Sequence, residues 1–170
     1  VDFLGGVNDP RVRWTSEPDR GQSDAINKGM RRATGEIVGW LNSDDLYAPG
    51  GLAAVAAAFD ANPAARWVIG RVEMVDEHDR PIRGAVTAYK NRWLDRYTYR
   101  RLLVENFVSQ MGVFWRRDFG EEVAYPGGEL LDASLHYCMD YDLWLRFGAR
   151  SEPLILDQTV AYFRYHAGSK

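Results

Sequence analysis

The segment that decides the fold reads Glu36-Ile-Val-Gly-Trp-Leu-Asn-Ser-Asp-Asp45. A short apolar run of this kind, with Gly35 before it and polar residues after it, predicts a buried strand over residues 36–41. Two adjacent carboxylates, Asp44 and Asp45, follow that strand directly. Because open α/β sheets bind ligands beyond the carboxyl ends of their strands, both carboxylates are expected where a ligand would lie.

Two interpretations of these carboxylates remain open at this point. Adjacent carboxylates repel each other unless a cation lies between them, and Mg²⁺ or Mn²⁺ takes carboxylate oxygens together with water and substrate phosphates. The first hypothesis is therefore a metal–diphosphate site at the strand end. The alternative is a turn and helix cap, because Asn, Ser and Asp all favour turns and N-caps.

The composition excludes several classes of protein. A chain of 170 residues with 46% apolar content is long enough for one domain with a real core. A net charge of −3 gives no overall basic footprint for nucleic acid. The longest apolar stretch, residues 52–59, is far too short for a transmembrane segment. Cys138 is the only cysteine, which fits a reducing compartment, so we expect a cytoplasmic location.

One basic cluster stands out against this background. It comprises Arg92, Arg96, Arg100 and Arg101, with aromatic residues interleaved. Most such clusters are solvated faces or ion-pair partners. The alternative is contact with anions or with a membrane surface, so a position peripheral to the inner face of a membrane is a second possibility.

The order of the expected elements predicts a mixed sheet with helices packed on it. Ser23 is a good N-cap for the first helix, and Gly35 is expected to end it. Helices are expected over residues 23–34, 50–60, 91–104 and 138–147. Strands are expected over residues 36–41, 66–75, 81–89, 107–115 and 154–165, with shorter ones at 1–4 and 11–14, a hairpin turn at 76–80, and a loop or short helix at 118–134.

Three further segments carry groups suited to chemistry. Asp140-Tyr-Asp142 falls in the first turn of an expected helix, where the dipole favours carboxylates, although Asp142 can simply pair with Arg146 four residues on. The loop before residue 23 contains Gly21 and precedes a helix N-terminus, which suits anionic groups. His166 follows the last expected strand, and a lone histidine there is more often a surface residue than a ligand.

Taken together, and in this order, these segments resemble the family-2 glycosyltransferases of the GT-A fold. The matching residues are 17–29, 34–45, 135–146 and 162–169, and the resemblance covers about residues 11–170. It implies a single α/β domain with a mixed, mostly parallel sheet flanked by helices. It also implies transfer of a sugar, such as a hexose, from a nucleotide-diphosphate donor to the hydroxyl group of a carbohydrate, lipid-linked or other acceptor.

The resemblance implies a divalent metal, Mn²⁺ or Mg²⁺, at the acidic motif. Asp44 stands at the position of the first metal ligand and Asp45 at that of a second. His166 stands where some enzymes of this fold supply a further ligand. The family usually has an acid at the position of Asn42, so this departure weakens the expected metal site.

The resemblance also implies contacts to donor and acceptor. Ser43 would lie near the donor ribose, beside Asp44, while Asp24 and Asn27 belong to the expected wall of the nucleotide pocket. Asp140 stands at the position of the catalytic base, and Gln110 is expected to face the acceptor. One base and no enzyme nucleophile would give inversion at the anomeric carbon.

The resemblance begins late in the family's pattern. The family normally opens with a strand, a nucleotide-binding loop, a helix and a second strand, and only a few residues precede the matching region here. We expect a form that lacks this half and exposes a sheet edge, so that it either forms a homodimer through the edge or has lost donor binding. The alternative function is therefore a non-catalytic binding or scaffold module. A metal-dependent phosphohydrolase on Asp44 and Asp45 would need more clustered carboxylates or histidines.

Overall fold

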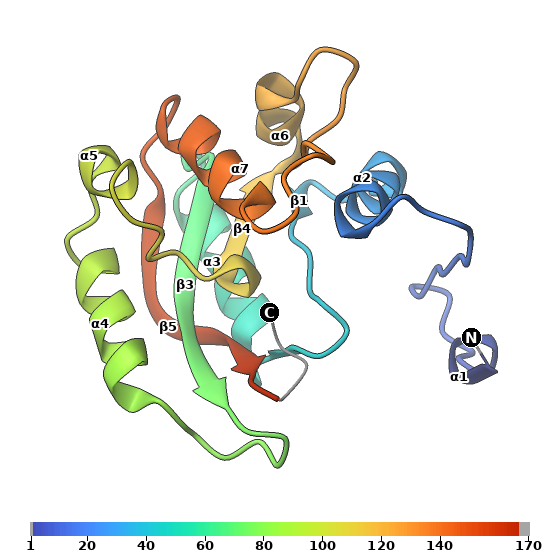
Figure 1. Cartoon of the computed structure of the whole chain (residues 1–170), viewed down its shortest axis with the longest axis horizontal. Coiled ribbons are helices and arrows are strands. Elements are labelled where there is room, and N and C mark those ends of the chain that lie inside the picture. Colours follow the sequence, from blue (N-terminus) through green and yellow to red (C-terminus); the bar gives the residue numbers. More distant parts are fainter. Residues whose placement is uncertain (1, 167–170) are drawn as a thin grey trace.

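The computed structural model of the chain describes residues 2–166 and contains a five-stranded mixed sheet (Figure 1). Its strands lie in the order β1 (Ile37–Val38), β4 (Val113–Arg116), β3 (Trp67–Val75), β5 (Leu154–Arg164) and β2 (Leu46–Tyr47). β1, β3 and β5 share one direction, while β4 and β2 run against their neighbours. The mixed α/β architecture is confirmed. The sheet is less parallel than expected, because β4 enters beside Ile69 and runs back along β3, which leaves β3–β5 as the parallel pairing among the described strands.

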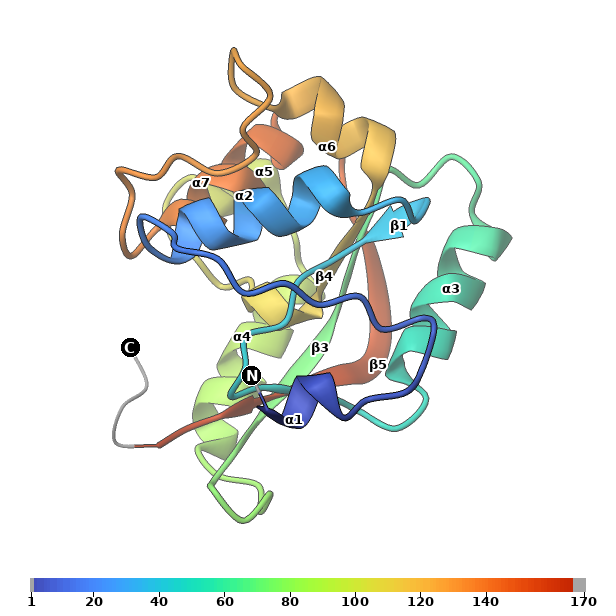
Figure 2. The ribbon, with the colours of Figure 1, turned by 90° about the vertical axis from the view of Figure 1, so that its right-hand side faces the viewer.

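Helices cover both faces of the sheet (Figure 2). α3 (Gly51–Ala61) packs on one face, and α2 (Gln22–Arg32), α4 (Gly84–Leu94), α5 (Tyr99–Leu102) and α7 (Met139–Gly148) lie on the other. α6 (Arg117–Val123) follows β4 directly, and a 3₁₀ turn, η1 (Gln110–Gly112), precedes it. α1 (Asp2–Gly5) lies apart from the sheet.

The alternation of β3 divides the core into two clusters. Trp67 and Ile69 face the side of α7, where they pack with Trp144 and Phe147, all fully buried. Val68 faces α3 on the opposite side. Successive strand residues point to opposite faces, so a strand buried on both sides reads as a continuous apolar run. The larger cluster fixes α7 against the sheet, and with it the position of Asp140.

Several long elements confirm the sequence expectations, and the middle of the chain corrects them. The strands expected at 66–75 and 154–165 and the helices expected at 50–60 and 138–147 are present within two residues. Residues 81–89 are not a strand, because only Pro81 bridges to Val75 before α4 begins. Proline has no N–H to donate to a ladder, and the chain leaves the sheet there. The helix expected at 91–104 is broken, because Thr98 caps a separate α5 by accepting a hydrogen bond from the backbone N–H of Arg101 at 3.2 Å.

Three shorter expectations are wrong. Residues 107–115 form mainly η1 and irregular backbone, with the strand confined to residues 113–116. Neither residues 2–4 nor residues 11–14 form a strand. Ser23 is not the N-cap of α2, because the helix begins at Gln22 and the Ser23 hydroxyl lies 2.9 Å from the sulfur of Met139 inside the protein.

The sheet edges are short. β1 and β2 contain two residues each, and short edge strands limit pairing with other chains. The homodimer expected through an exposed edge therefore stays a prediction. Within residues 2–166, no helix is long and apolar enough to cross a membrane.

Candidate functional site

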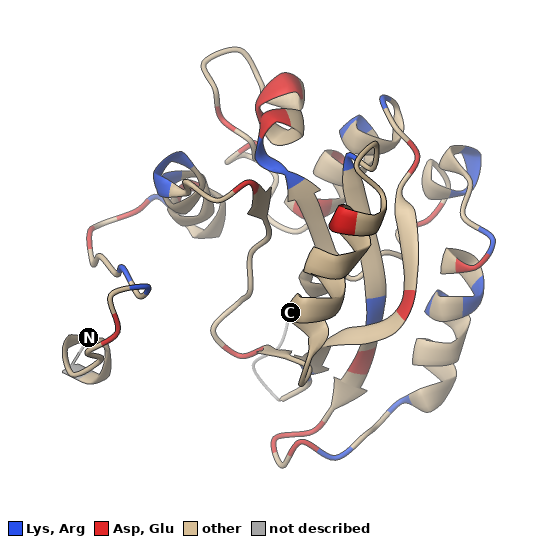
Figure 3. Cartoon of the chain, turned by 180° about the vertical axis from the view of Figure 1, so that it is seen from behind, with Lys and Arg blue, Asp and Glu red and all other residues tan. Residues whose placement is uncertain are grey.

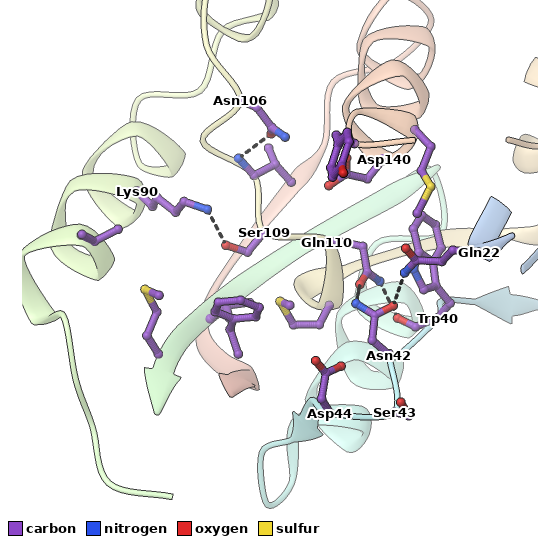
Figure 4. Close-up of a pocket in the computed structure, with 18 of the residues that line it drawn as sticks. Gln22, Trp40, Asn42, Ser43, Asp44, Lys90, Asn106, Ser109, Gln110 and Asp140 are labelled. Atoms are coloured by element: carbon purple, nitrogen blue, oxygen red, sulfur yellow. Dashed lines mark hydrogen bonds between the residues drawn. The ribbon is translucent and has the colours of Figure 1, made fainter. Parts of the chain in front are cut away.

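A cavity of about 680 Å³ opens where the chain segments after β1 and before α7 approach each other (Figure 4). Asp44 lines one part of it and Asp140 another, so the two carboxylates expected to act together do line one cavity. The remaining wall comes from α4, from the segment that leads into η1, and from the apolar side chains of the two central strands. Such a space is large enough for a sugar-sized ligand with part of its leaving group.

Asp44 and His166 form a close pair at this site. Asp44 comes from the turn after β1, and His166 follows β5. The Nε2 atom of His166 lies 3.1 Å from Oδ2 of Asp44, and each side chain is about one-third exposed. A carboxylate oxygen and an imidazole nitrogen at this separation can both reach one divalent cation.

Asp45 faces the protein interior instead of the cavity. Its Oδ1 accepts a hydrogen bond from the backbone N–H of Arg164 at 3.1 Å, and its Oδ2 accepts one from the Asn42 amide at 3.3 Å. Burial raises the pKa of Asp45 to about 6, and the neighbouring charge of Asp44 acts in the same direction. Asp45 therefore ties the acidic turn to β5.

The described residues do not assemble the three-ligand set expected from the sequence. In the part of the chain that the structure describes, no three His, Cys, Asp or Glu side chains come together as a group able to hold a metal. Both oxygens of Asp45 accept hydrogen bonds within the fold, and its role as second ligand stays a prediction. Asp44 and His166 remain, and two protein groups suffice where substrate phosphates and water supply the other positions.

A chain of amide groups lines the floor of the cavity. Gln22 donates to the Asn42 carbonyl oxygen at 3.1 Å, and Asn42 donates to the Gln110 side-chain oxygen at 3.3 Å. Gln110 in turn donates to the main-chain oxygen of Trp40 at 2.6 Å. An amide both donates and accepts, whereas a carboxylate only accepts. Asn42, where the family usually has an acid, therefore links α2 to η1 through its amide.

The two acidic residues at the start of α7, Asp140 and Asp142, have different roles. Asp142 pairs with Arg146 at 2.8 Å, as the alternative for this residue predicted, and Arg146 also donates to the carbonyl oxygens of Val123 and Leu130. Asp140 is half-buried and faces the cavity. Burial raises the pKa of the Asp140 carboxyl, and the nearby charge of Lys90 opposes that rise.

Lys90 is a cavity residue that the sequence analysis missed. It projects from α4, and its ammonium lies 3.2 Å from the hydroxyl of Ser109. Burial lowers the pKa of Lys90, while the carboxylates of Asp140 and Glu105 oppose that change. The sequence feature that could have indicated Lys90 is that it is the single lysine in residues 83–105, where the other basic residues are all arginine.

The residues expected along the nucleotide lie outside this cavity, with the exception of Ser43. Ser43 is exposed and lines the cavity beside Asp44. Asp24 accepts one hydrogen bond from the backbone N–H of Arg20 at 2.9 Å and pairs with Lys28 at 3.2 Å. The buried Asn27 amide donates to the carbonyl oxygen of Leu131 at 2.8 Å and accepts from its N–H at 2.9 Å. Both have structural roles, and their contact with a donor stays a prediction.

A family model matches most of this chain, and curated relatives match shorter parts of it. The family model described as glycosyl transferase family 2 matches residues 2–121. An uncharacterized glycosyltransferase of Mycobacterium tuberculosis (strain CDC 1551 / Oshkosh) is 38% identical over 61 residues, which cover 36% of this chain and 22% of the relative. An uncharacterized glycosyltransferase of Nostoc sp. (strain PCC 7120) is 31% identical over 77 residues, which cover 45% of this chain and 24% of the relative. The aligned parts span less than a quarter of each relative.

Proposed function

Because the chain belongs to glycosyl transferase family 2, we propose that its cavity moves a sugar from a nucleotide-diphosphate donor to an acceptor hydroxyl with inversion. Glycosyl transfer in general is what the family and the relatives' names support. The observation that carries the finer proposal is that Asp44 and Asp140 line different parts of one cavity.

Asp140 is the proposed general base. Attack at the anomeric carbon passes through an oxocarbenium-like state, and the attacking hydroxyl must lose its proton. A half-buried carboxylate that faces the cavity can accept this proton. The raised pKa of Asp140 lies closer to neutral pH, which makes its carboxylate a stronger base. The positive charge of Lys90 acts in the other direction and favours the ionised form.

Asp44 and His166 are proposed to lie at the leaving diphosphate. Their 3.1 Å separation suits a shared divalent cation such as Mn²⁺ or Mg²⁺. Such an ion, when bound, stabilises the charge that develops on the diphosphate. Ser43 lies beside this pair at the cavity rim, where a donor ribose would follow the diphosphate.

The groups that face the cavity support the proposed inversion. A retaining double displacement needs a nucleophilic side chain, and a second carboxylate in the reach of the anomeric carbon is the usual one. Asp44 is assigned to the diphosphate and Asp45 is turned into the fold. A single base on the acceptor side is then consistent with direct displacement and inversion.

Calorimetric titration with nucleoside diphosphates, with and without Mn²⁺, tests donor binding. The proposal predicts binding that depends on Mn²⁺ and is weakened in Asp44→Asn, with no change in Asp60→Asn, an exposed carboxylate on α3. If a folded chain binds none of the common nucleoside diphosphates, the result favours the non-catalytic binding module.

Transfer assays test the base. With a donor and acceptor that turn over, Asp140→Asn should lower kcat by about 10²- to 10⁴-fold, while donor affinity remains. Undiminished transfer in Asp140→Asn would remove this residue as the base.

A further inference from the structure

The outer surface of α4 and α5 carries arginines without acidic partners. Most arginines of the chain pair with a carboxylate, as Arg66, Arg71 and Arg116 do. Within the described residues, Arg92, Arg96 and Arg100 are exposed and make no ion pair. Figure 3 shows the positive residues along these two helices at one side of the molecule.

The charge of this region opposes that of the whole chain. Residues 83–105 contain six Lys and Arg against two Asp and Glu, a net charge of +4, whereas the chain carries −3. Both acids are already paired: Asp95 with Arg71, and Glu105 with Arg101. The unpaired positive charge is therefore local and faces solvent.

Exposed apolar side chains lie beside these arginines. Leu103 is 53% exposed and Val104 77% exposed at the end of α5, and Tyr89 is 45% exposed on α4. Tyr89 donates to the Glu105 carboxylate at 2.8 Å, so α4 and the segment after α5 are adjacent. Tyr89 and Arg92 are three residues apart on α4, which places them on one side of the helix, and Arg96 lies in the turn that directly follows it.

We propose that this surface, formed by Tyr89, Arg92, Arg96, Arg100, Leu103 and Val104, docks on an anionic lipid bilayer. Arginines attract anionic headgroups, and small aliphatic and tyrosine side chains enter the interfacial region. Most arginines elsewhere on the chain have acidic partners, whereas on this surface exposed arginines without ion pairs lie next to exposed apolar side chains.

The proposed docking surface and the cavity lie on two sides of α4. Val86 precedes Tyr89 by one helical turn, is 42% exposed and also lines the cavity. The inner side of α4 supplies Lys90 to the cavity while its outer side belongs to the docking surface. Docking would therefore place the α4 wall of the cavity close to the membrane, which suits an acceptor with a lipid anchor. This last step rests on the proposed transfer function, and the docking itself does not.

Vesicle co-sedimentation without donor or acceptor tests the docking. The chain should bind vesicles of phosphatidylcholine mixed with phosphatidylglycerol, bind phosphatidylcholine alone much more weakly, and lose binding as salt rises. Each arginine near an anionic surface contributes about fivefold in affinity, so R92Q/R96Q/R100Q together should lower it roughly a hundredfold. The matched control is R11Q/R117Q/R150Q, three exposed arginines elsewhere whose loss changes the net charge equally.

A second variant separates docking from general charge attraction. L103S/V104S keeps every charge and should reduce the binding that persists at moderate salt. Equal losses in the two triple variants, or no preference for anionic vesicles, would overturn the proposal. A dimer that R92Q/R96Q/R100Q dissociates, in a chain that binds no vesicles, would assign the surface to a second copy and would also overturn it. All substituted positions on the surface are exposed, so thermal melts of the variants should match that of the original chain.

Discussion

Replacing Asn27 separates a structural role from a donor-binding role at the expected nucleotide wall. Asn27 is 3% exposed, and its amide satisfies both the N–H and the carbonyl oxygen of Leu131, which is 1% exposed. Asn27→Ala leaves both backbone groups without their partner. A buried polar group that loses its partner costs about 1–3 kcal/mol, which gives about 2–6 kcal/mol for the two groups. Water that enters the space left by the side chain offsets part of this cost, so the free energy of unfolding should fall by about 2–4 kcal/mol.

This loss converts to a shift that thermal unfolding can measure. For a chain of this size, each kcal/mol shifts Tm by about 2–4 °C, so Asn27→Ala should melt about 5–15 °C lower. Asn8→Ala is the matched control, because Asn8 is exposed and a substitution there should change stability by about 0.5 kcal/mol or less. Donor affinity, measured by calorimetry well below the lower Tm, should be unchanged. An unchanged Tm with weakened donor binding would refute the structural role.

The remaining predictions concern the cavity, the amide chain that lines it, and the packing of η1 against β3. Lys90→Met should raise the pKa of Asp140, because the Lys90 ammonium favours the ionised carboxylate. The acid limb of the pH–rate profile should then move to higher pH, so that activity is lost mainly at the low-pH end. Lys90→Arg, which keeps the positive charge, should restore the original profile. Asn42→Asp removes an amide donor and adds a carboxylate to the acidic turn, so Tm without metal should fall and the rise in Tm on adding Mn²⁺ should exceed that of the original chain. Gly112→Ala would place a Cβ 2.7 Å from the backbone oxygen of Gly70, so chemical denaturation should show a loss of about 1–3 kcal/mol.

The helices and strands that could be predicted are those whose local hydrophobic pattern agrees with how they pack in the fold. β3 and β5 are long and β-prone, and α3 is Ala-rich and ends at Asn62-Pro63, so local preference and tertiary packing agree. Residues 84–89 contain Val86 and Tyr89, which favour strands locally, yet they begin α4. They do so because the chain leaves the sheet at Pro81 and packs the inner side of α4 over β3. That outcome depends on distant partners and is not encoded in the local pattern.

Some residues of the candidate site could likewise be predicted from the sequence, and others could not. The resemblance of the acidic motifs led to Asp44 and Asp140, and both line the cavity. In the amide chain, Asn42 bonds to Gln22, which is 20 positions away, and to Gln110, which is 68 positions away. No local sequence pattern predicts contacts over such separations. Asp45 was assigned to the metal from its place beside Asp44. Its side chain instead turns to the backbone of Arg164, 119 positions away, which only the packing of β2 on β5 brings near.

The central claim is that Asp44 and Asp140 serve one reaction centre, the first at the leaving diphosphate and the second at the acceptor. Crystals soaked with Mn²⁺ and a nucleoside diphosphate test it most directly, because anomalous scattering locates the manganese without ambiguity. One manganese peak should contact Asp44 and His166, with the diphosphate inside the cavity that Asp140 lines. Manganese and diphosphate bound away from Asp44, or in a pocket that Asp140 does not face, would contradict it.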